Sequence, residues 1–307
     1  MLKTEERLLI GLKSLERLKP NLHLPQIRRT PAGGSTTAAP DDQKPDGPEF
    51  KGFTSAPALE TVLEQAGPLS PNTVILGACE DGLPFLLDLT NPAPGALLVA
   101  GDLGSGKSRL LRAILASAAA INPASQVEFN ILAQNITEFK AVSETASCQE
   151  LLACDDPAAS DVIRDLAEVV DQRRHGSQSG PAMLLAIDGL TALVDELNEP
   201  IFERLLSIIR HGPRTRVWTV ATLSSTQVEQ VEEPLLAAFR TRLIGKIAST
   251  RLAELLTGSL ISGAQELSGG YQFCVPFGDE WIRFWVCEEA PQAEPKEESD
   301  ESRDALV

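Results

Sequence analysis

The sequence predicts an α/β fold with a mostly parallel sheet, helices on both of its faces and flanking β-hairpins. Three observations lead to this prediction. Short apolar segments of strand length alternate with amphipathic segments of helix length. A glycine-rich turn at residues 101–108 joins one apolar strand directly to a helix. Paired apolar runs separated by short turns also mark both ends of the alternating region.

The first paired runs are Thr73–Ala78 and Pro84–Leu89, which are joined around Asp81–Gly82 and are expected to form a hairpin. Ala96–Ala100 is a short apolar run that predicts a buried strand entering the glycine-rich turn. The apolar periodicity of Arg109–Ala116 predicts the helix that leaves it.

Beyond this helix, the remaining segments continue the alternation without internal repeats. We expect strands at Gln126–Leu132, Ala182–Ile187, Arg216–Ala221 and Arg242–Ile247. We expect helices at Asp161–Arg174, Pro200–His211, Val228–Arg240 and Thr250–Thr257. The chain then closes with a predicted hairpin, Gly270–Val275 and Glu280–Val286.

Residues 51–287 are expected to form one main domain between two extensions of different composition. Residues 1–50 combine an amphipathic helix at Thr4–Leu18 with a linker whose Pro, Gly, Ser, Thr and Asp content is typical of disorder. The helix either docks a partner or a neighbouring subunit, or covers an apolar patch of its own domain. Residues 288–307 carry eight acids against Lys296 and Arg303, as a disordered solubilising tail or a regulatory arm would.

The charge and the apolar content limit the class of protein. The formal net charge is -16, which argues against nonspecific nucleic-acid binding by the whole surface. A ring with a narrow basic channel, however, can still be acidic outside. Because no segment approaches the roughly 18 apolar residues of a membrane helix, and the first residues lack the apolar core of a signal peptide, we expect a soluble cytoplasmic protein without membrane insertion.

The cysteines and histidines do not have metal-site spacing. The five cysteines form no C-x-x-C pair and the three histidines are scattered. We therefore expect reduced, mostly buried thiols.

The glycine-rich turn GDLGSGKS has the spacing of a phosphate-binding loop. Its glycines allow the backbone N–H groups to wrap around a phosphate, and the following helix directs its positive end at the same oxygens. Lys107 is expected to reach the β and γ phosphates, and the Ser108 hydroxyl is expected to bind Mg²⁺. The predicted nucleotide-binding residues are Gly101, Asp102, Leu103, Gly104, Ser105, Gly106, Lys107, Ser108 and Arg109.

A second landmark is Asp188, a carboxylate at the end of the apolar strand Met183–Ile187. An acid at this place holds the Mg²⁺ shell opposite the phosphate loop in nucleotide hydrolases; the alternative is an ordinary turn or helix cap. Gly189 follows, where many ATPases carry a water-activating glutamate. Asp195 and Glu196 either substitute for it or are solvated helix charges.

The strand at Arg216–Ala221 ends in a polar tip that includes Thr222, and such a tip commonly senses the γ-phosphate. Among the basic residues after this tip, Arg242 and Arg251 are candidates to reach a neighbouring subunit's nucleotide across an oligomer border. The alternative for each arginine is a helix-end charge or a surface ion pair.

In this order the motifs resemble the motor core of FtsK/SpoIIIE/HerA-type ATPases over Thr73–Val286. The resemblance is carried by LLVAGDLGSGKS, LLAIDGL, RHGPRTRVWTVATLSS, FRTRLIGKIASTRLAELLTG and, most particularly, GAQELSGG before the closing hairpin. It implies a RecA-like P-loop NTPase fold and a hexameric ring whose ATP cycle moves double-stranded DNA or, in the type VII secretion branch, protein substrates. Matched by position, Lys107, Ser108, Asp188 and Thr222 are implied to serve ATP and Mg²⁺, and Arg242 or Arg251 to act between subunits.

Two departures from the family pattern affect hydrolysis. The catalytic glutamate is Gly189, and the sensor glutamine is Leu223. We expect weak or partner-stimulated hydrolysis, or else a switch or assembly subunit of the secretion or STAND type that binds ATP with little turnover. If water activation alone is deficient, Gly189→Glu is expected to speed hydrolysis.

Overall fold

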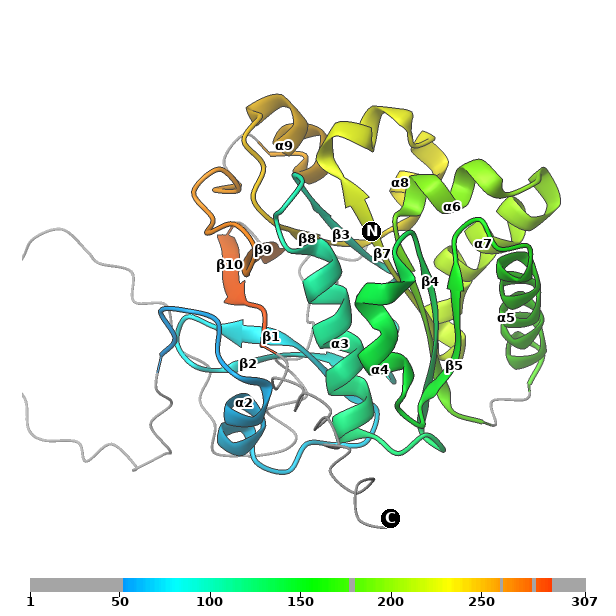
Figure 1. Cartoon of the computed structure of the whole chain (residues 1–307), viewed down its shortest axis with the longest axis horizontal. Coiled ribbons are helices and arrows are strands. Elements are labelled where there is room, and N and C mark those ends of the chain that lie inside the picture. The colour runs from blue at the N-terminus through cyan, green and yellow to red at the C-terminus, as the bar shows by residue number, and fades with distance from the viewer. Residues whose placement is uncertain (1–51, 177–179, 260–261, 278–279, 289–307) are drawn as a thin grey trace, which may run out of the picture.

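A computed structural model of the chain describes residues 52–176, 180–259, 262–277 and 280–288. The strands of these residues form one sheet in the order β2-β1-β10-β9-β8-β3-β7-β6-β4-β5 (Figure 1). The predicted α/β fold, with a mostly parallel sheet and helices on both faces, is confirmed. The expected N-terminal helix, its linker and all but the first residue of the acidic tail lie outside the described residues.

The parallel part of the sheet places β3 (Leu97–Gly101) between β7 (Val217–Ser224) and β8 (Thr241–Ile244). Next to β7 follow, in order, β6 (Ala182–Asp188), β4 (Val127–Ala133) and the edge strand β5 (Cys148–Ala153). Because parallel strands end at one edge of the sheet, this order collects the ends of β3, β7 and β6 side by side.

Both predicted hairpins are present, and both extend the same sheet. β1 (Thr73–Cys79) pairs with β2 (Pro84–Asp88), and β9 (Gln272–Phe277) pairs with β10 (Glu280–Trp285). β9 bonds to β8 and β10 bonds to β1, all in antiparallel fashion. The closing hairpin therefore lies between the parallel strands and the first hairpin.

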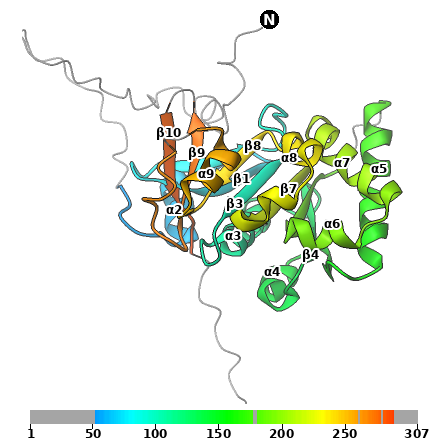
Figure 2. The ribbon, with the colours of Figure 1, turned by 90° about the horizontal axis from the view of Figure 1, so that it is seen from above.

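Helices cover the sheet from two sides (Figure 2). One face carries α3 (Lys107–Ile121), η2 (Ile136–Phe139) and α4 (Lys140–Ser143). The other carries α5 (Ala158–Arg174), α6 (Leu190–Glu196), α7 (Glu199–His211), η3 (Gly212–Thr215) and α9 (Thr250–Thr257). A separate helix, α2 (Leu59–Ala66), packs on the first hairpin. No helix among these described segments is both long and apolar enough to cross a bilayer.

Several short elements were not predicted, and two differences from the prediction have a clear physical reason. The single helix expected at Val228–Arg240 is wrong, because the structure has η4 (Ser225–Gln230) followed by α8 (Glu233–Ala238). Pro234 lies in the first turn of α8, where its missing N–H costs nothing, whereas in a helix interior it would remove a hydrogen bond. β5 was not predicted, because as an edge strand it is only partly buried and lacks a continuous apolar run.

The five cysteines are free thiols, and burial keeps them protonated. Burial raises the pKa of Cys79, Cys154, Cys274 and Cys287 to about 12 and that of Cys148 to about 11. An unfolded thiol ionises near pH 8.5, so above that pH the unfolded state binds fewer protons than the native state. The thiols' contribution to stability is therefore present below about pH 8.5 and is lost as the pH rises toward the folded pKa values.

We expect the free energy of unfolding, measured with urea, to fall between about pH 8 and pH 9.5. Lysine and tyrosine titrate higher, and Cys287→Ala serves as the internal control for their contribution. Removing this buried thiol should flatten the pH slope, whatever its effect on stability at pH 7. An unchanged slope in Cys287→Ala would contradict the assignment of the slope to buried thiols.

Candidate nucleotide-binding site

The predicted phosphate loop follows the central strand of the sheet and opens a helix. β3 ends at Gly101, and α3 begins at Lys107. Gly104 and Gly106 have φ values of 76° and 94°, which side-chain-bearing residues rarely adopt. A Cβ at Gly106 would also overlap the carbonyl oxygen of Gly270, whereas at Gly104 it would meet nothing within 4 Å. Gly106 is therefore required both by its backbone conformation and by the segment lying against it.

The Lys107 side chain curls back over its own loop. Its Nζ donates to the carbonyl oxygens of Gly101 at 3.1 Å and Asp102 at 2.8 Å. Burial lowers the pKa of Lys107, while the charges of Asp188 and Asp102 act in the opposite direction. The ammonium group is thus held inside the loop by weak backbone partners, ready to exchange them for an anion.

Ser108 and Asp188 meet although 80 residues separate them. The Ser108 hydroxyl lies 3.0 Å from both carboxylate oxygens of Asp188. Thr222, on the strand between them, donates its hydroxyl to Asp188 Oδ1 at 2.9 Å and accepts from the backbone N–H of Gly189 at 2.8 Å. Burial raises the pKa of Asp188, and the hydrogen bonds from Thr222 and Ser108 offset part of that shift.

Hydrogen bonds to the Asp102 carboxylate connect the phosphate loop to the segments that follow β7 and β8. One of its carboxylate oxygens accepts from the Ser225 hydroxyl just after β7, and the other accepts from the N–H of Ala248 beyond β8 at 2.8 Å. The sequence marked Asp102 only as a member of the loop. The neighbouring Leu103 side chain is 97% exposed at the tip of the loop, so it makes no packing contribution in this chain.

Arg109 connects the start of α3 to the segment that precedes the closing hairpin. Its guanidinium donates to the carbonyl oxygen of Gly270 at 2.8 Å and lies 4.0 Å from the centre of the Tyr271 ring. The GAQELSGG segment is therefore part of the wall of the site, and Ala264 and Leu267 anchor it in the core.

The residues of the loop fit a bound nucleotide with Mg²⁺. The Ser105 Oγ is buried in the loop without a hydrogen-bond partner, and the Ser108 and Asp188 oxygens are the hard ligands that Mg²⁺ prefers. The described residues contain no group of three or more His, Cys, Asp or Glu that would hold a metal alone. This suits Mg²⁺, which usually takes few protein ligands and binds through substrate phosphates.

The sequence of this region matches a known protein family. Residues 67–184 match the model of the FtsK/SpoIIIE family, and this range contains the whole phosphate loop and ends within β6. This part of the domain is similar to the FtsK/SpoIIIE family.

Relatives of this chain include secretion system proteins. The ESX-5 secretion system protein EccC5 of Mycobacterium marinum is 27% identical over 204 residues, which cover 57% of this chain and 14% of that protein. The chain therefore spans a small part of the length of this relative.

Solved structures share the fold. EccC (ATPases 2 and 3) of Thermomonospora curvata, in complex with a signal sequence peptide, has a TM-score of 0.62 at 17% identity, covering 80% of this chain and 45% of that one. The pCW3 conjugation coupling protein TcpA, solved with ATPγS, has a TM-score of 0.59 at 16% identity, covering 78% of this chain and 71% of that one.

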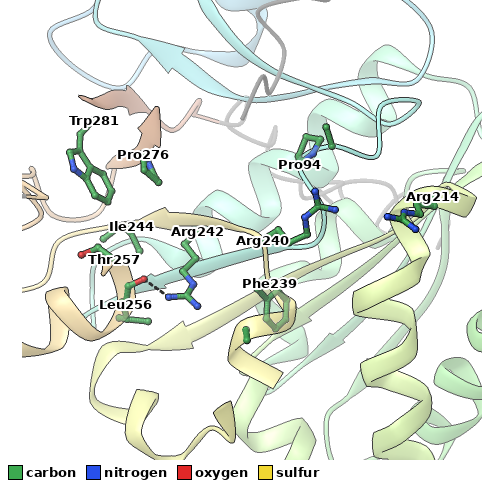
Figure 3. A pocket seen from close by; sticks show the side chains of 12 residues that line it. Pro94, Arg214, Phe239, Arg240, Arg242, Ile244, Leu256, Thr257, Pro276 and Trp281 are labelled. Atoms are coloured by element: carbon green, nitrogen blue, oxygen red, sulfur yellow. Dashed lines mark hydrogen bonds between the residues drawn. The ribbon is translucent and has the colours of Figure 1, made fainter. Parts of the chain in front are cut away.

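The two candidate arginines have partners within this chain. Arg242 donates to the carbonyl oxygens of Leu256 at 2.8 Å and Leu236 at 3.1 Å, on the sheet face opposite α3. It lines a cavity of about 580 Å³ together with Arg214 and Arg240 (Figure 3). Arg251 is 78% exposed and pairs with Glu229 at 2.6 Å. Neither side chain joins the contacts around Lys107, Ser108 and Asp188, and action across a subunit border stays a prediction.

Gly189 is the position where the sequence and the structure lead to different expectations about the effect of a glutamate. Its φ of 104° is left-handed, and a Cβ there would lie 2.7 Å from the Gln134 side chain. A glutamate at this position would therefore be strained, because side chains rarely adopt this backbone conformation and the Gln134 side chain would have to move. Asp195, which the sequence offered as a substitute, lies with Glu196 in the last turn of α6, and neither is among the groups that hydrogen-bond to the Asp188 carboxylate or shift its pKa.

Proposed function

We propose that this FtsK/SpoIIIE-type domain binds ATP together with Mg²⁺ and hydrolyses it slowly. The observation that carries the proposal is the contact of the Ser108 hydroxyl with both oxygens of Asp188, next to an ammonium group held in the same loop. A structural ion pair does not need this arrangement, whereas a phosphate with a divalent cation does.

The side chains of the site have separate tasks in this proposal. Lys107 exchanges the carbonyls of Gly101 and Asp102 for phosphate oxygens, and the N–H groups of the loop and the first turn of α3 complete the cradle. Ser108 and Asp188 are the residues that would hold Mg²⁺, which, when bound, neutralises charge on the phosphates. Thr222 keeps the Asp188 carboxylate oriented toward Ser108.

For the load of the domain we propose a protein of the kind handled by secretion systems. Support comes from the relative EccC5, a secretion system protein, and from the acidic balance of -16, which disfavours a nucleic-acid surface. The competing proposal is the double-stranded DNA load expected from the sequence. Its support is the likeness to the conjugation coupling protein TcpA. A hexameric ring, with Arg242 or Arg251 at the subunit border, belongs to both proposals, as does a protein partner for Thr4–Leu18.

Steady-state ATP hydrolysis with and without long double-stranded DNA tests these proposals. With a protein load, we expect slow turnover that DNA changes by less than about twofold, because no contact to DNA stabilises the transition state. DNA-stimulated turnover would favour the DNA proposal. ATP binding without turnover in either condition would contradict hydrolysis and favour the switch or assembly subunit, and light scattering with and without ATP would then show whether the nucleotide drives oligomerisation.

A further inference from the structure

The Gln134 side chain occupies the place that a glutamate at position 189 would need. Three of its atoms lie within 2.9 Å of where a Gly189 Cβ would be. Gln134 directly follows β4, and its N–H donates to the carbonyl oxygen of Asp188 at 3.1 Å. The segment after β4 therefore lies against the end of β6, and any carboxylate that serves the attacking water has to come from a neighbouring segment rather than from residue 189.

The segment after β4 carries Glu138, in η2, and hydrogen bonds from neighbouring side chains hold its carboxylate in place. Asn135 caps η2 by accepting from the Thr137 N–H at 3.2 Å, and its Nδ2 lies 3.3 Å from Glu138 Oε1. Arg112 donates to the other oxygen, Oε2, at 3.0 Å. Both oxygens of Glu138 thus have a donor, which fixes the direction of the carboxylate.

The position of Arg112 shows which side of the site Glu138 borders. Arg112 lies one helical turn beyond Ser108, so both side chains leave the same face of α3. Glu138 therefore lies beside the Ser108 and Asp188 pair, on the side toward β4. The repulsion between the two carboxylates contributes to raising the pKa of Asp188. The Glu138 side chain is 43% exposed, so water reaches it.

We propose that Glu138 is the carboxylate that activates water for ATP hydrolysis in this domain, in place of a glutamate at position 189. The proposal rests on the hydrolysis proposed above. The water oxygen bonds to the γ-phosphorus, the bond from that phosphorus to the β–γ bridging oxygen breaks, and ADP leaves with the electron pair. The water proton passes to the Glu138 carboxylate and from there to solvent, so that ADP and inorganic phosphate are formed without a further reactant.

The competing interpretation is that Glu138 only pairs with Arg112 on the surface, an interaction worth roughly 0–1 kcal/mol. Two variants break the same pair in different ways. Glu138→Gln removes the proton acceptor and keeps the shape, whereas Arg112→Ala keeps the acceptor and removes its partner. Glu144→Gln makes the same chemical change at an exposed position at the end of α4 and serves as the matched control.

The experiment measures kcat for ATP hydrolysis and the Kd for ATP in all four proteins. We expect Glu138→Gln to lower kcat by about 10²–10⁴-fold with an unchanged Kd, and Arg112→Ala to lower it by less than about tenfold. Glu144→Gln should match the unsubstituted protein. Equal losses in Glu138→Gln and Arg112→Ala, or no loss in Glu138→Gln, would overturn the role of Glu138 while leaving hydrolysis intact. Absence of turnover in the unsubstituted protein would instead refute hydrolysis itself, and with it this role.

Discussion

Replacing Lys107 by alanine is expected to abolish detectable ATP turnover and to weaken ATP binding. Lys107 Nζ is the positive side-chain charge held within the phosphate loop, where it donates to two carbonyl oxygens. Removing one charged group that faces the developing charge of a reaction typically costs about 10²–10³ in rate. Hydrolysis assays together with calorimetric titration of ATP measure both effects.

The control for this variant is Lys140→Ala, which removes an exposed lysine from α4 outside the phosphate loop. Because burial disfavours the Lys107 ammonium in the nucleotide-free protein, Lys107→Ala should retain the thermal unfolding midpoint of the unsubstituted protein within a few degrees. A folded Lys107→Ala protein that hydrolyses ATP at the original rate would place the nucleotide elsewhere.

Gly189→Glu is expected to destabilise the domain and to slow hydrolysis. The residue would have to adopt a φ of 104°, and its Cβ would lie 2.7 Å from the Gln134 side chain. A side chain forced into such a backbone region costs about 1–3 kcal/mol, before Gln134 is displaced. The Gly189 N–H also holds Thr222, which in turn holds Asp188, so a shift here disturbs the Mg²⁺-binding carboxylate.

Gly189→Ala separates strain from chemistry, since it brings the same backbone penalty without a carboxylate. If strain decides the outcome, both variants lose stability in urea titrations and both hydrolyse ATP more slowly than the unsubstituted protein. Faster hydrolysis by Gly189→Glu alone would show that the backbone adapts, and that the missing carboxylate limited the rate.

The parallel strands were predictable because each is a continuous apolar run, as in Leu97–Gly101 and Ala182–Asp188. The order of the strands in the sheet was not predictable from such runs, because the residues of one strand do not show which other strands it pairs with. The break before α8 had a local signal, Pro234, which apolar periodicity across Val228–Arg240 outweighed. The partly exposed strand Cys148–Ala153 had no comparable signal.

Within the candidate site, the phosphate loop was predictable because glycine spacing and the lysine-serine pair form a local pattern. The proximity of Ser108 and Asp188 followed from the rule that parallel strands end at one edge. The conformation of Gly189 was not predictable. The sequence shows that the glutamate is absent, but it does not show which φ the glycine adopts. Glu138 was not predictable as a site residue, because it lies in a short polar stretch after β4. Its pairing with Arg112 is visible only in the structure.

The phosphate loop depends on residues that are synthesised long after it. Asp102 is bound by Ser225, which lies 123 residues later, and Arg109 by Gly270, which lies 161 residues later. A nascent chain that ends before these residues contains the whole GDLGSGKS motif without the contacts that set its shape. Such long-range contacts form late in folding because closing the intervening loops costs entropy. Competence to hold a nucleotide is therefore acquired only after the segments around Ser225 and Gly270 have joined the fold.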